Sequence, residues 1–141
     1  MKLIKTLKNN KWLVIILLIS AILRIYKLDF QSVWLDEIHS LSEANPKFSL
    51  LEVYNSLLSA EPHPPLYFVL VQLFFKIFGY TSFVLRFFSF LVGLGGLITL
   101  YFLAKELYNK KVAIYSVVFL GINSYHIYYS QEGRMYALLF F

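Results

Sequence analysis

Apolar residues in this chain fall into long blocks separated by polar segments, and they do not alternate residue by residue. The first block runs from Trp12 to Leu23, broken by Ser20. Later blocks cover residues 66–78, 83–103 and 112–125, and another begins at Met135. Backbone polar groups in lipid must be satisfied within their own segment, which favours helices. The pattern therefore predicts an all-α fold of polytopic transmembrane helices, with interfacial juxtamembrane helices in the first outside loop.

The N-terminal segment predicts an uncleaved first span at about residues 12–28. Lysines recur every three residues ahead of it, and Arg24 and Lys27 at its far end are expected to snorkel to the interface. A basic start before a short apolar core is also typical of a secretory signal peptide. No small-x-small cleavage site follows, which favours a retained helix. The lysines place the N-terminus in the cytoplasm.

The segment from Asp29 to Glu61 is acidic and is expected to lie outside the membrane. Its apolar stripes predict two amphipathic helices, at about 35–44 and 49–59, that lie in the interface rather than crossing it. Ser49 and Glu52 have the spacing of a capping box, which predicts where the second helix begins.

The topology depends on an apolar helix predicted at about 65–78, which is shorter than the about 20 residues needed to cross a bilayer. If this helix spanned the membrane, the lysines that follow the next block would face outside. If it lies in the outer interface, the spans are about 83–103 and 112–125, and Lys105, Lys110 and Lys111 are cytoplasmic. The positive-inside rule prefers the second arrangement, so we expect an interfacial helix.

Composition supports a multi-pass protein of the cell membrane. The chain has 141 residues, of which 59% are hydrophobic, whereas soluble domains are about 45–50% apolar. The formal net charge is +5, but the basic residues lie at segment ends, so no nucleic-acid partner is expected. Cysteine is absent, which excludes disulfides and cysteine metal sites. Because the last apolar segment, 135–141, is too short to span, we expect a truncated N-terminal part of a longer protein.

Asp36 and Glu37 are the leading candidates for catalysis. A carboxylate near lipid is desolvated, which raises its pKa and makes it a better base for a hydroxyl proton at neutral pH. The alternative is a solvated pair of acids at a helix start, where the helix dipole favours negative charge.

His63 and Arg86 are candidates for binding an anionic substrate. Proline restricts the residue before it, so His63 is held in an extended turn ahead of Pro64 and Pro65, at a helix N-terminus that suits a phosphate. Arg86 is a cation inside an apolar block, and such charges face a partner or a cavity. A phosphate or the Asp36–Glu37 pair would serve as that partner. The alternatives are a loop histidine and a snorkelling arginine.

Glu132 and Arg134 form a further candidate, either an anion-binding group or a local ion pair. Tyrosines at 125, 128, 129 and 136 are typical of an interfacial aromatic belt. Gly93, Gly95 and Gly96 lie inside a span and indicate close helix packing rather than a phosphate loop. The spacing of the histidines with nearby acids matches no standard metal site.

These residues together resemble a known family. The motifs are Trp34-Leu35-Asp36-Glu37, His63-Pro64-Pro65-Leu66-Tyr67, Leu85-Arg86 and Tyr128-Tyr129-Ser130-Gln131-Glu132-Gly133-Arg134-Met135-Tyr136-Ala137-Leu138. They occur in this order in the GT-C superfamily of membrane glycosyltransferases. The branch that the chain resembles is glycosyltransferase family 39, which is related to protein O-mannosyltransferases and to the aminoarabinose transferase of lipid A, and includes the RgtA/B/C/D-like domain.

The resemblance implies a hexosyl- or mannosyltransferase-like enzyme of the cell envelope. It implies a polyprenyl-phosphate-linked sugar as donor and a lipid, glycan or protein as acceptor, with the active face outside. In this family the first-loop acid, here Asp36, is taken as the base or acceptor-binding carboxylate. His63 occupies a donor-side position that some relatives fill with an acid, and Arg86 matches the arginine expected near the lipid phosphate. No cofactor is certain, and a divalent cation is left open.

Two other functions remain open at this stage. A lipid or sugar transporter would need broken helices or charges near the membrane centre, whereas the charges here cluster at one interface. A non-catalytic membrane fragment or subunit is the other, because family members usually have many more spans than this chain supplies.

Overall fold

The computed structural model describes residues 10–60 and 65–141, and every regular element in these two ranges is a helix. The predicted all-α class is therefore confirmed for the described residues. The predicted turn around His63 lies outside them. The helices are α2 (Lys11–Ile25), α3 (Leu35–Glu43), α4 (Leu50–Ala60), α5 (Leu66–Phe78), α6 (Ser82–Leu107), α7 (Lys110–Ile122), α8 (Ser124–Gln131) and α9 (Tyr136–Leu139).

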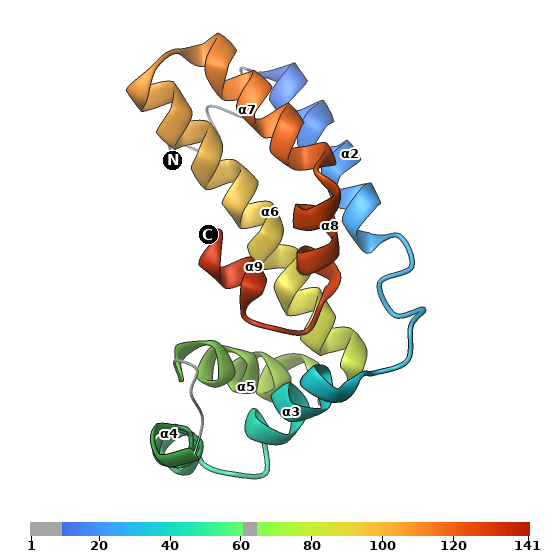
Figure 1. Cartoon of the computed structure of the whole chain (residues 1–141), viewed down its shortest axis with the longest axis vertical. Helices are drawn as coiled ribbons and strands as arrows, with labels where there is room; N and C mark the ends of the chain where they lie inside the picture. Colours follow the sequence, from blue (N-terminus) through green and yellow to red (C-terminus); the bar gives the residue numbers. More distant parts are fainter. Residues whose placement is uncertain (1–9, 61–64) are drawn as a thin grey trace.

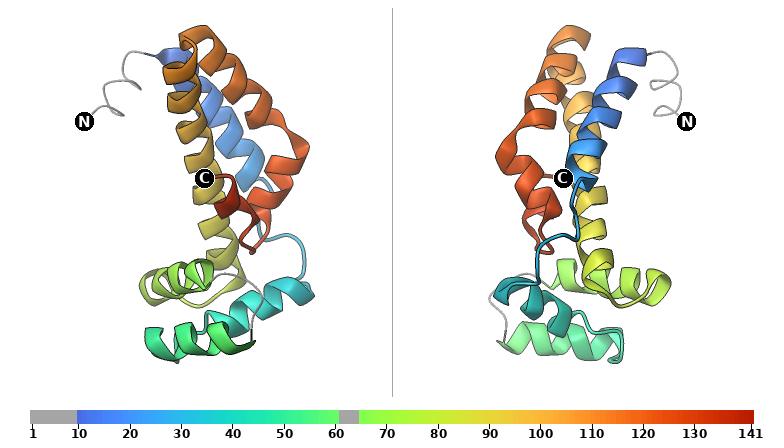
Figure 2. Two further views of the ribbon diagram at one scale, coloured as in Figure 1. Left: turned by 60° about the vertical axis from the view of Figure 1, so that its left-hand side comes forward. Right: turned by 90° about the vertical axis from the view of Figure 1, so that its right-hand side faces the viewer.

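The helices form two parts, an elongated bundle and a layer across one of its ends (Figures 1 and 2). Helices α2, α6 and α7 lie side by side in the bundle, and α8 and α9 pack against α6 near the layer. The layer consists of α3, α4 and α5, which lie crosswise to α6. The start of α2, the end of α6 and the start of α7 all lie at the end of the bundle away from the layer.

Among the described residues, one helix is long and apolar enough to cross a membrane, namely α6. Its 26 residues correspond to about 39 Å at about 1.5 Å per residue, against about 30 Å for a hydrocarbon core. The helices beside it are shorter, with 15 residues in α2 and 13 in α7.

Two apolar cores match the two parts. Helices α2, α6 and α7 bury one core between them, which includes Leu13, Leu97, Tyr101, Ala113 and Val117. The layer and the first turns of α6 bury the other, which includes Val53, Leu57, Phe68, Phe75 and Leu85. Polar residues at the junction between these cores therefore meet away from bulk water.

Several helix ends follow from local sequence. The predicted capping box is confirmed, since Glu52 N–H donates to Ser49 Oγ at 3.2 Å and Ser49 N–H donates to the Glu52 carboxylate at 2.7 Å. Thr81 Oγ1 accepts from Val84 N–H at 3.2 Å and begins α6. Gly79 ends α5 with φ 98°, a conformation that suits glycine.

The polar residue Asn123 divides the segment that the sequence pattern treats as one helix up to residue 125. Helix α7 ends at Ile122, and the side chain of Asn123 accepts from His126 N–H at 2.9 Å to begin α8. Asparagine in an extended conformation is a favoured N-cap, so the chain changes direction here.

Arg24 does not snorkel to the interface, and that expectation is wrong. Its side chain is fully buried and points from α2 to the end of α7. The guanidinium donates to the carbonyl oxygens of Gly121 at 2.9 Å and Leu120 at 3.3 Å, and contacts His126 Nδ1 at 2.9 Å. A cation at the C-terminal end of a helix is favourable, which explains the inward orientation.

Close packing accounts for Gly93, as expected from the sequence. A Cβ at this position would overlap the side chain of Ser130 on α8. The glycine therefore lets α8 lie directly on α6, and this contact brings residues 132–134 to the first turns of α6.

Candidate active site

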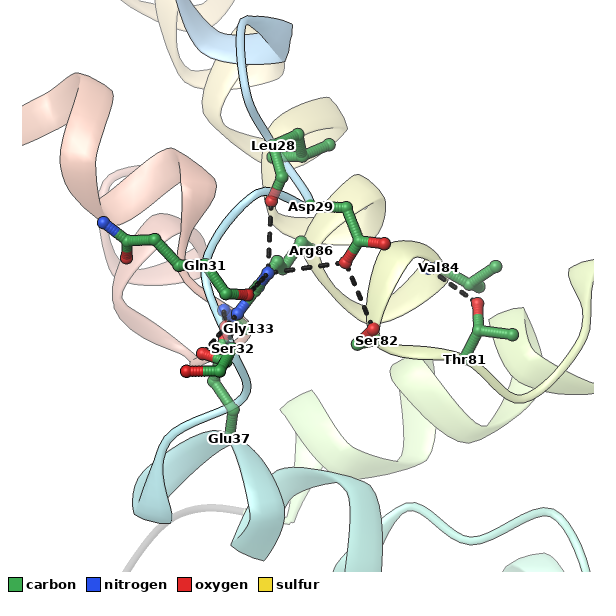
Figure 3. Close-up of polar contacts among 10 residues, drawn as sticks. All are labelled: Leu28, Asp29, Gln31, Ser32, Glu37, Thr81, Ser82, Val84, Arg86 and Gly133. Atoms are coloured by element: carbon green, nitrogen blue, oxygen red, sulfur yellow. Dashed lines mark hydrogen bonds and ion pairs between the residues drawn. The ribbon is translucent and has the colours of Figure 1, made fainter.

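Arg86 is the centre of the polar junction between the bundle and the layer. It lies near the start of α6, and only 4% of its surface is exposed. Its guanidinium forms a two-point ion pair with Glu37 on α3, with Nε to Oε1 at 2.9 Å and Nη2 to Oε2 at 2.6 Å. Figure 3 shows this pair beneath the connection from α2 to α3. The buried cation therefore has the partner that its position in an apolar helix requires.

The remaining donors of Arg86 hold the connection between α2 and α3. Nη1 donates to the carbonyl of Gln31 at 2.9 Å and, more weakly, to the carbonyl of Leu28 and the carboxylate of Asp29, both at 3.4 Å. Nη2 also reaches the carbonyl of Ser32 at 3.4 Å. Every nitrogen of the guanidinium thus has a protein partner, and a substrate phosphate would compete with these contacts.

Glu37 also binds the returning chain after α8. The backbone N–H of Gly133 donates to Glu37 Oε1 at 2.9 Å. A Cβ at Gly133 would lie 2.5 Å from Leu85 and 3.2 Å from Glu37 Oε1, so a larger residue would push the backbone away. Glu37 is 2% exposed and joins three segments, which favours a positioning role for this side chain.

Arg134 makes a second link between the returning chain and α3. Its Nη1 donates to the carbonyl of Asp36 at 3.2 Å and to Ser40 Oγ at 3.3 Å, while Ser89 Oγ donates to the Arg134 carbonyl at 3.4 Å. These contacts fix the start of α3 against α6. The Asp36 side chain itself is half-buried and remains beside this junction.

Glu132 differs from the other acids of the junction because it is buried and its carboxyl group has no hydrogen-bond partner within the described residues. The residue is 6% exposed, and neither carboxyl oxygen has a hydrogen-bond partner among the described residues. Burial, together with the negative charges of Glu37 and Asp36, raises the pKa of Glu132 to about 7, and the positive charge of Arg134 opposes this shift only in part. Near neutral pH this carboxyl is therefore close to the midpoint of its titration.

A cleft of about 290 Å³ opens beside the junction. Its lining combines aromatic rings with polar groups and comprises Leu23, Tyr26, Lys27, Leu28, Phe30, Gln31, Trp34, Glu37, Arg86, Tyr128, Gln131 and Glu132. Aromatic faces with a few polar groups are typical of a site for a small organic ligand.

Lys27 and Gln131 are cleft residues that sequence reasoning did not select. Lys27 has a φ of 56°, and its Nζ lies 4.7 Å from the ring centre of Phe30 and 5.5 Å from that of Tyr26. The Gln131 amide donates to the carbonyls of Arg24 at 3.0 Å and Tyr26 at 2.9 Å, and so ties α8 to the end of α2. The position of Gln131 in the motif beside Glu132 was a usable signal, whereas nothing in the sequence distinguishes Lys27 from other interfacial lysines.

The structure brings most of the candidate residues together. Asp36, Glu37, Arg86, Glu132 and Arg134 all lie at the junction, although they come from three distant segments. His126 lies apart from them, beside Arg24. Within residues 10–60 and 65–141, no three His, Asp or Glu side chains are grouped so that they could hold a metal ion.

Comparison with known proteins gives one match. A protein-family model described as "Dolichyl-phosphate-mannose-protein mannosyltransferase" matches residues 62–139, which is more than half of the chain. The matched segment contains Arg86, Glu132 and Arg134, while Asp36 and Glu37 precede it. No curated protein and no solved structure matches the chain.

Replacing Glu37 with glutamine is expected to destabilise the protein by about 3–5 kcal/mol, because it leaves the buried charge of Arg86 without its main partner. Asp29→Asn is the control, since Asp29 is 48% exposed and 3.4 Å from Arg86, and a contact of this kind contributes about 0–1 kcal/mol. The measurement is the free energy of unfolding in detergent micelles. Equal losses in the two variants would show that the pair does not hold the junction.

The raised pKa of Glu132 predicts a pH-dependent stability. The folded protein binds this proton more tightly than the unfolded chain does. The contribution of Glu132 to the free energy of unfolding is therefore fully present below the ordinary pKa of 4.5, and it is lost as the pH rises to about 7. The loss is on the order of 3 kcal/mol at pH 8. Thermal unfolding of Glu132→Gln should therefore match the wild type in acid but occur at a higher temperature at pH 8. The control is Glu106→Gln, an exposed position at the other end of α6. If Glu132→Gln follows the wild type at every pH, the carboxyl is not buried in its neutral form.

Proposed function

The chain belongs to the dolichyl-phosphate-mannose-protein mannosyltransferase family, and from this membership we propose that it takes part in glycosyl transfer at the outer face of the cell membrane. The donor is a polyprenyl-phosphate-linked sugar, and the acceptor is a lipid, a glycan or a protein. The observation that carries the proposal is the aromatic and charged cleft beside Arg86. Its lining includes Arg86 and Glu132 from the segment that matches the family, and Gln31 and Glu37 from the acidic first loop.

The proposed topology has α2, α6 and α7 as spans and the layer of α3, α4 and α5 in the outer interface. Its support is the separation of charge between the two ends of the bundle. Lys11, Lys105, Lys110 and Lys111 lie at the helix ends away from the layer, with Glu106 among them, while Asp36, Glu37, Glu132 and Arg86 lie beside the layer. The 13-residue α5 lies crosswise to α6, as an interfacial helix would.

In this topology the α6–α7 turn faces the cytoplasm, which a single engineered cysteine can test. The chain has no cysteine of its own, so Asn109→Cys gives a unique label site. An impermeant maleimide added outside intact cells should leave it unlabelled and should label Lys47→Cys, which lies in the first outside loop. Labelling of Asn109→Cys from outside would require α5 to span the membrane.

We propose a direct displacement in which the first loop supplies the base. The acceptor oxygen forms a bond to the anomeric carbon of the sugar, and the bond from this carbon to the phosphate oxygen breaks. The lipid phosphate leaves with the electron pair, and Asp36 takes the acceptor proton. Asp36 is suited to this step because its side chain is half-buried, whereas both oxygens of Glu37 are already bound.

The charge of the departing phosphate requires cations nearby. Arg86 and Arg134 supply a fixed positive field, and Arg86 acts mainly through position because its nitrogens bind the first loop. Lys27 lines the cleft and is more exposed, so it is the cation best able to move onto a phosphate. His63, which lies outside the described residues, remains proposed as a donor-side contact.

Asp36→Asn is expected to lower sugar transfer by about 100-fold or more, because general bases contribute about 10²–10⁴ in rate. The measurement is transfer of radiolabelled mannose from dolichyl-phosphate mannose in membranes that contain the protein. Glu43→Gln, at the other end of α3, is the control and should keep wild-type activity.

Near-wild-type transfer by Asp36→Asn would contradict the base assignment. Transfer that is absent from the unaltered protein would favour the alternative of a non-catalytic membrane subunit. A transporter would need charges near the membrane centre, whereas the charges of the described residues lie towards the ends of the bundle. This arrangement does not favour a transporter.

A further inference from the structure

Glu132 is the one buried acid of the junction, among the described residues, whose carboxyl group has no bound partner. Its 6% exposure places it under the surface of the cleft that it helps to line. Both carboxyl oxygens are covered and accept no hydrogen bond in the described part of the chain. Burying an ionised carboxylate without a partner costs far more than burying the neutral acid.

The surroundings of Glu132 also disfavour a negative charge. Glu37 and Asp36 on α3 are negative, and Tyr128 on α8 adds no positive charge. Neither nearby arginine donates to the Glu132 carboxyl: Arg86 is paired with Glu37, and Arg134 donates to the neutral oxygens Asp36 O and Ser40 Oγ, while its buried Nε has no partner among the described residues. Lys27 lies on the cleft wall with its ammonium over the Phe30 ring. With all three acids ionised, Glu132 would therefore carry a buried charge that no hydrogen bond within the described residues stabilises.

We propose that Glu132 carries its proton when the cleft receives an anionic lipid phosphate, and that this proton is required for donor binding. The inference rests on the proposed function and names the protonation state in which that site works. An ionised Glu132 would repel the phosphate, because like charges beside a buried group interact more strongly than they do in bulk water. The protonated acid removes this repulsion and leaves the field of Arg86, Arg134 and Lys27 to attract the phosphate.

Binding that depends on one proton has a defined pH profile. Above neutral pH the affinity for the donor falls about tenfold per pH unit, because each binding event must take up a proton. Glutamine has the shape of the neutral acid and cannot ionise. Glu132→Gln should therefore bind the donor as tightly at pH 9 as the wild type does at pH 6.

The test is equilibrium binding of dolichyl-phosphate mannose to the whole chain in lipid nanodiscs between pH 6 and pH 9. This probe is a phosphodiester, whose single charge is constant over the range, so a slope cannot come from the probe. The wild type and the control Glu106→Gln should lose affinity with rising pH, while Glu132→Gln should give a flat profile. A wild-type slope that persists in Glu132→Gln, or loss of binding by a folded Glu132→Gln protein, would overturn the proposal.

Two further measurements separate this inference from the proposed function. Inorganic phosphate alone should not displace the lipid at equal concentration, and displacement would mean that the cleft recognises free phosphate instead of the donor. The infrared difference spectrum between wild type and Glu132→Gln should contain the carbonyl stretch of a protonated carboxyl at pH 6. If the donor never binds but this band is present, the proposed function fails and the neutral state of Glu132 stands. If the band is missing, the inference fails whatever the donor does.

Discussion

The buried ion pair between Arg86 and Glu37 is the interaction on which the rest of the junction depends. A guanidinium in the first turns of an apolar helix has to be neutralised, because water cannot reach it there. The chain does this by bringing α3 and the connection at residues 28–32 over the end of α6. The same carboxylate then receives the backbone of Gly133, so three segments meet at one group.

A buried pair of this kind does not make the fold stable by itself, since removing two ions from water costs much of what their attraction returns. Its effect is to make one arrangement of the loops more stable than the alternatives, in which the buried charge would lack its partner. Any register in which Glu37 faces solvent would leave Arg86 with only its weaker ion pair to Asp29. The pair thereby selects which face of α3 is turned inward, and it sets the depth of the cleft wall that Glu37 and Arg86 share.

Features that depend on neighbouring residues were predictable from the sequence. Pro65 and Gly79 bracket α5, the Ser49–Glu52 box begins α4, and the apolar blocks locate the bundle helices. The need of Arg86 for a partner also followed from its place in an apolar segment. The sequence did not show which of Asp36 and Glu37 pairs with Arg86. That depends on how α3 is rotated about its axis, and the rotation is set by a contact with a residue 49 positions away.

Other features could not be read locally for the same reason. Arg24 looked like an interfacial cation, but the carbonyls that hold it belong to α7, 97 positions further along the chain. The isolation of Glu132 depends on how Arg86 and Arg134 are oriented, because both donate to groups on α3 instead. Lys27 gains its place in the cleft from a left-handed backbone conformation and from the ring of Phe30, neither of which has a sequence signature.

The spacing of the contacts around Glu37 also sets an order of assembly during synthesis. Its pairing with Arg86 closes a loop of 49 positions, whereas its contact with Gly133 closes one of 96. The first becomes available once the start of α6 has been made, but the second has to wait until α7 and α8 have followed. Closing the longer loop costs more chain entropy, and earlier pairing of Arg86 lowers that cost by holding Glu37 in place. The cleft is therefore a late product of folding, completed only when the chain has crossed the bundle again and returned to its first loop.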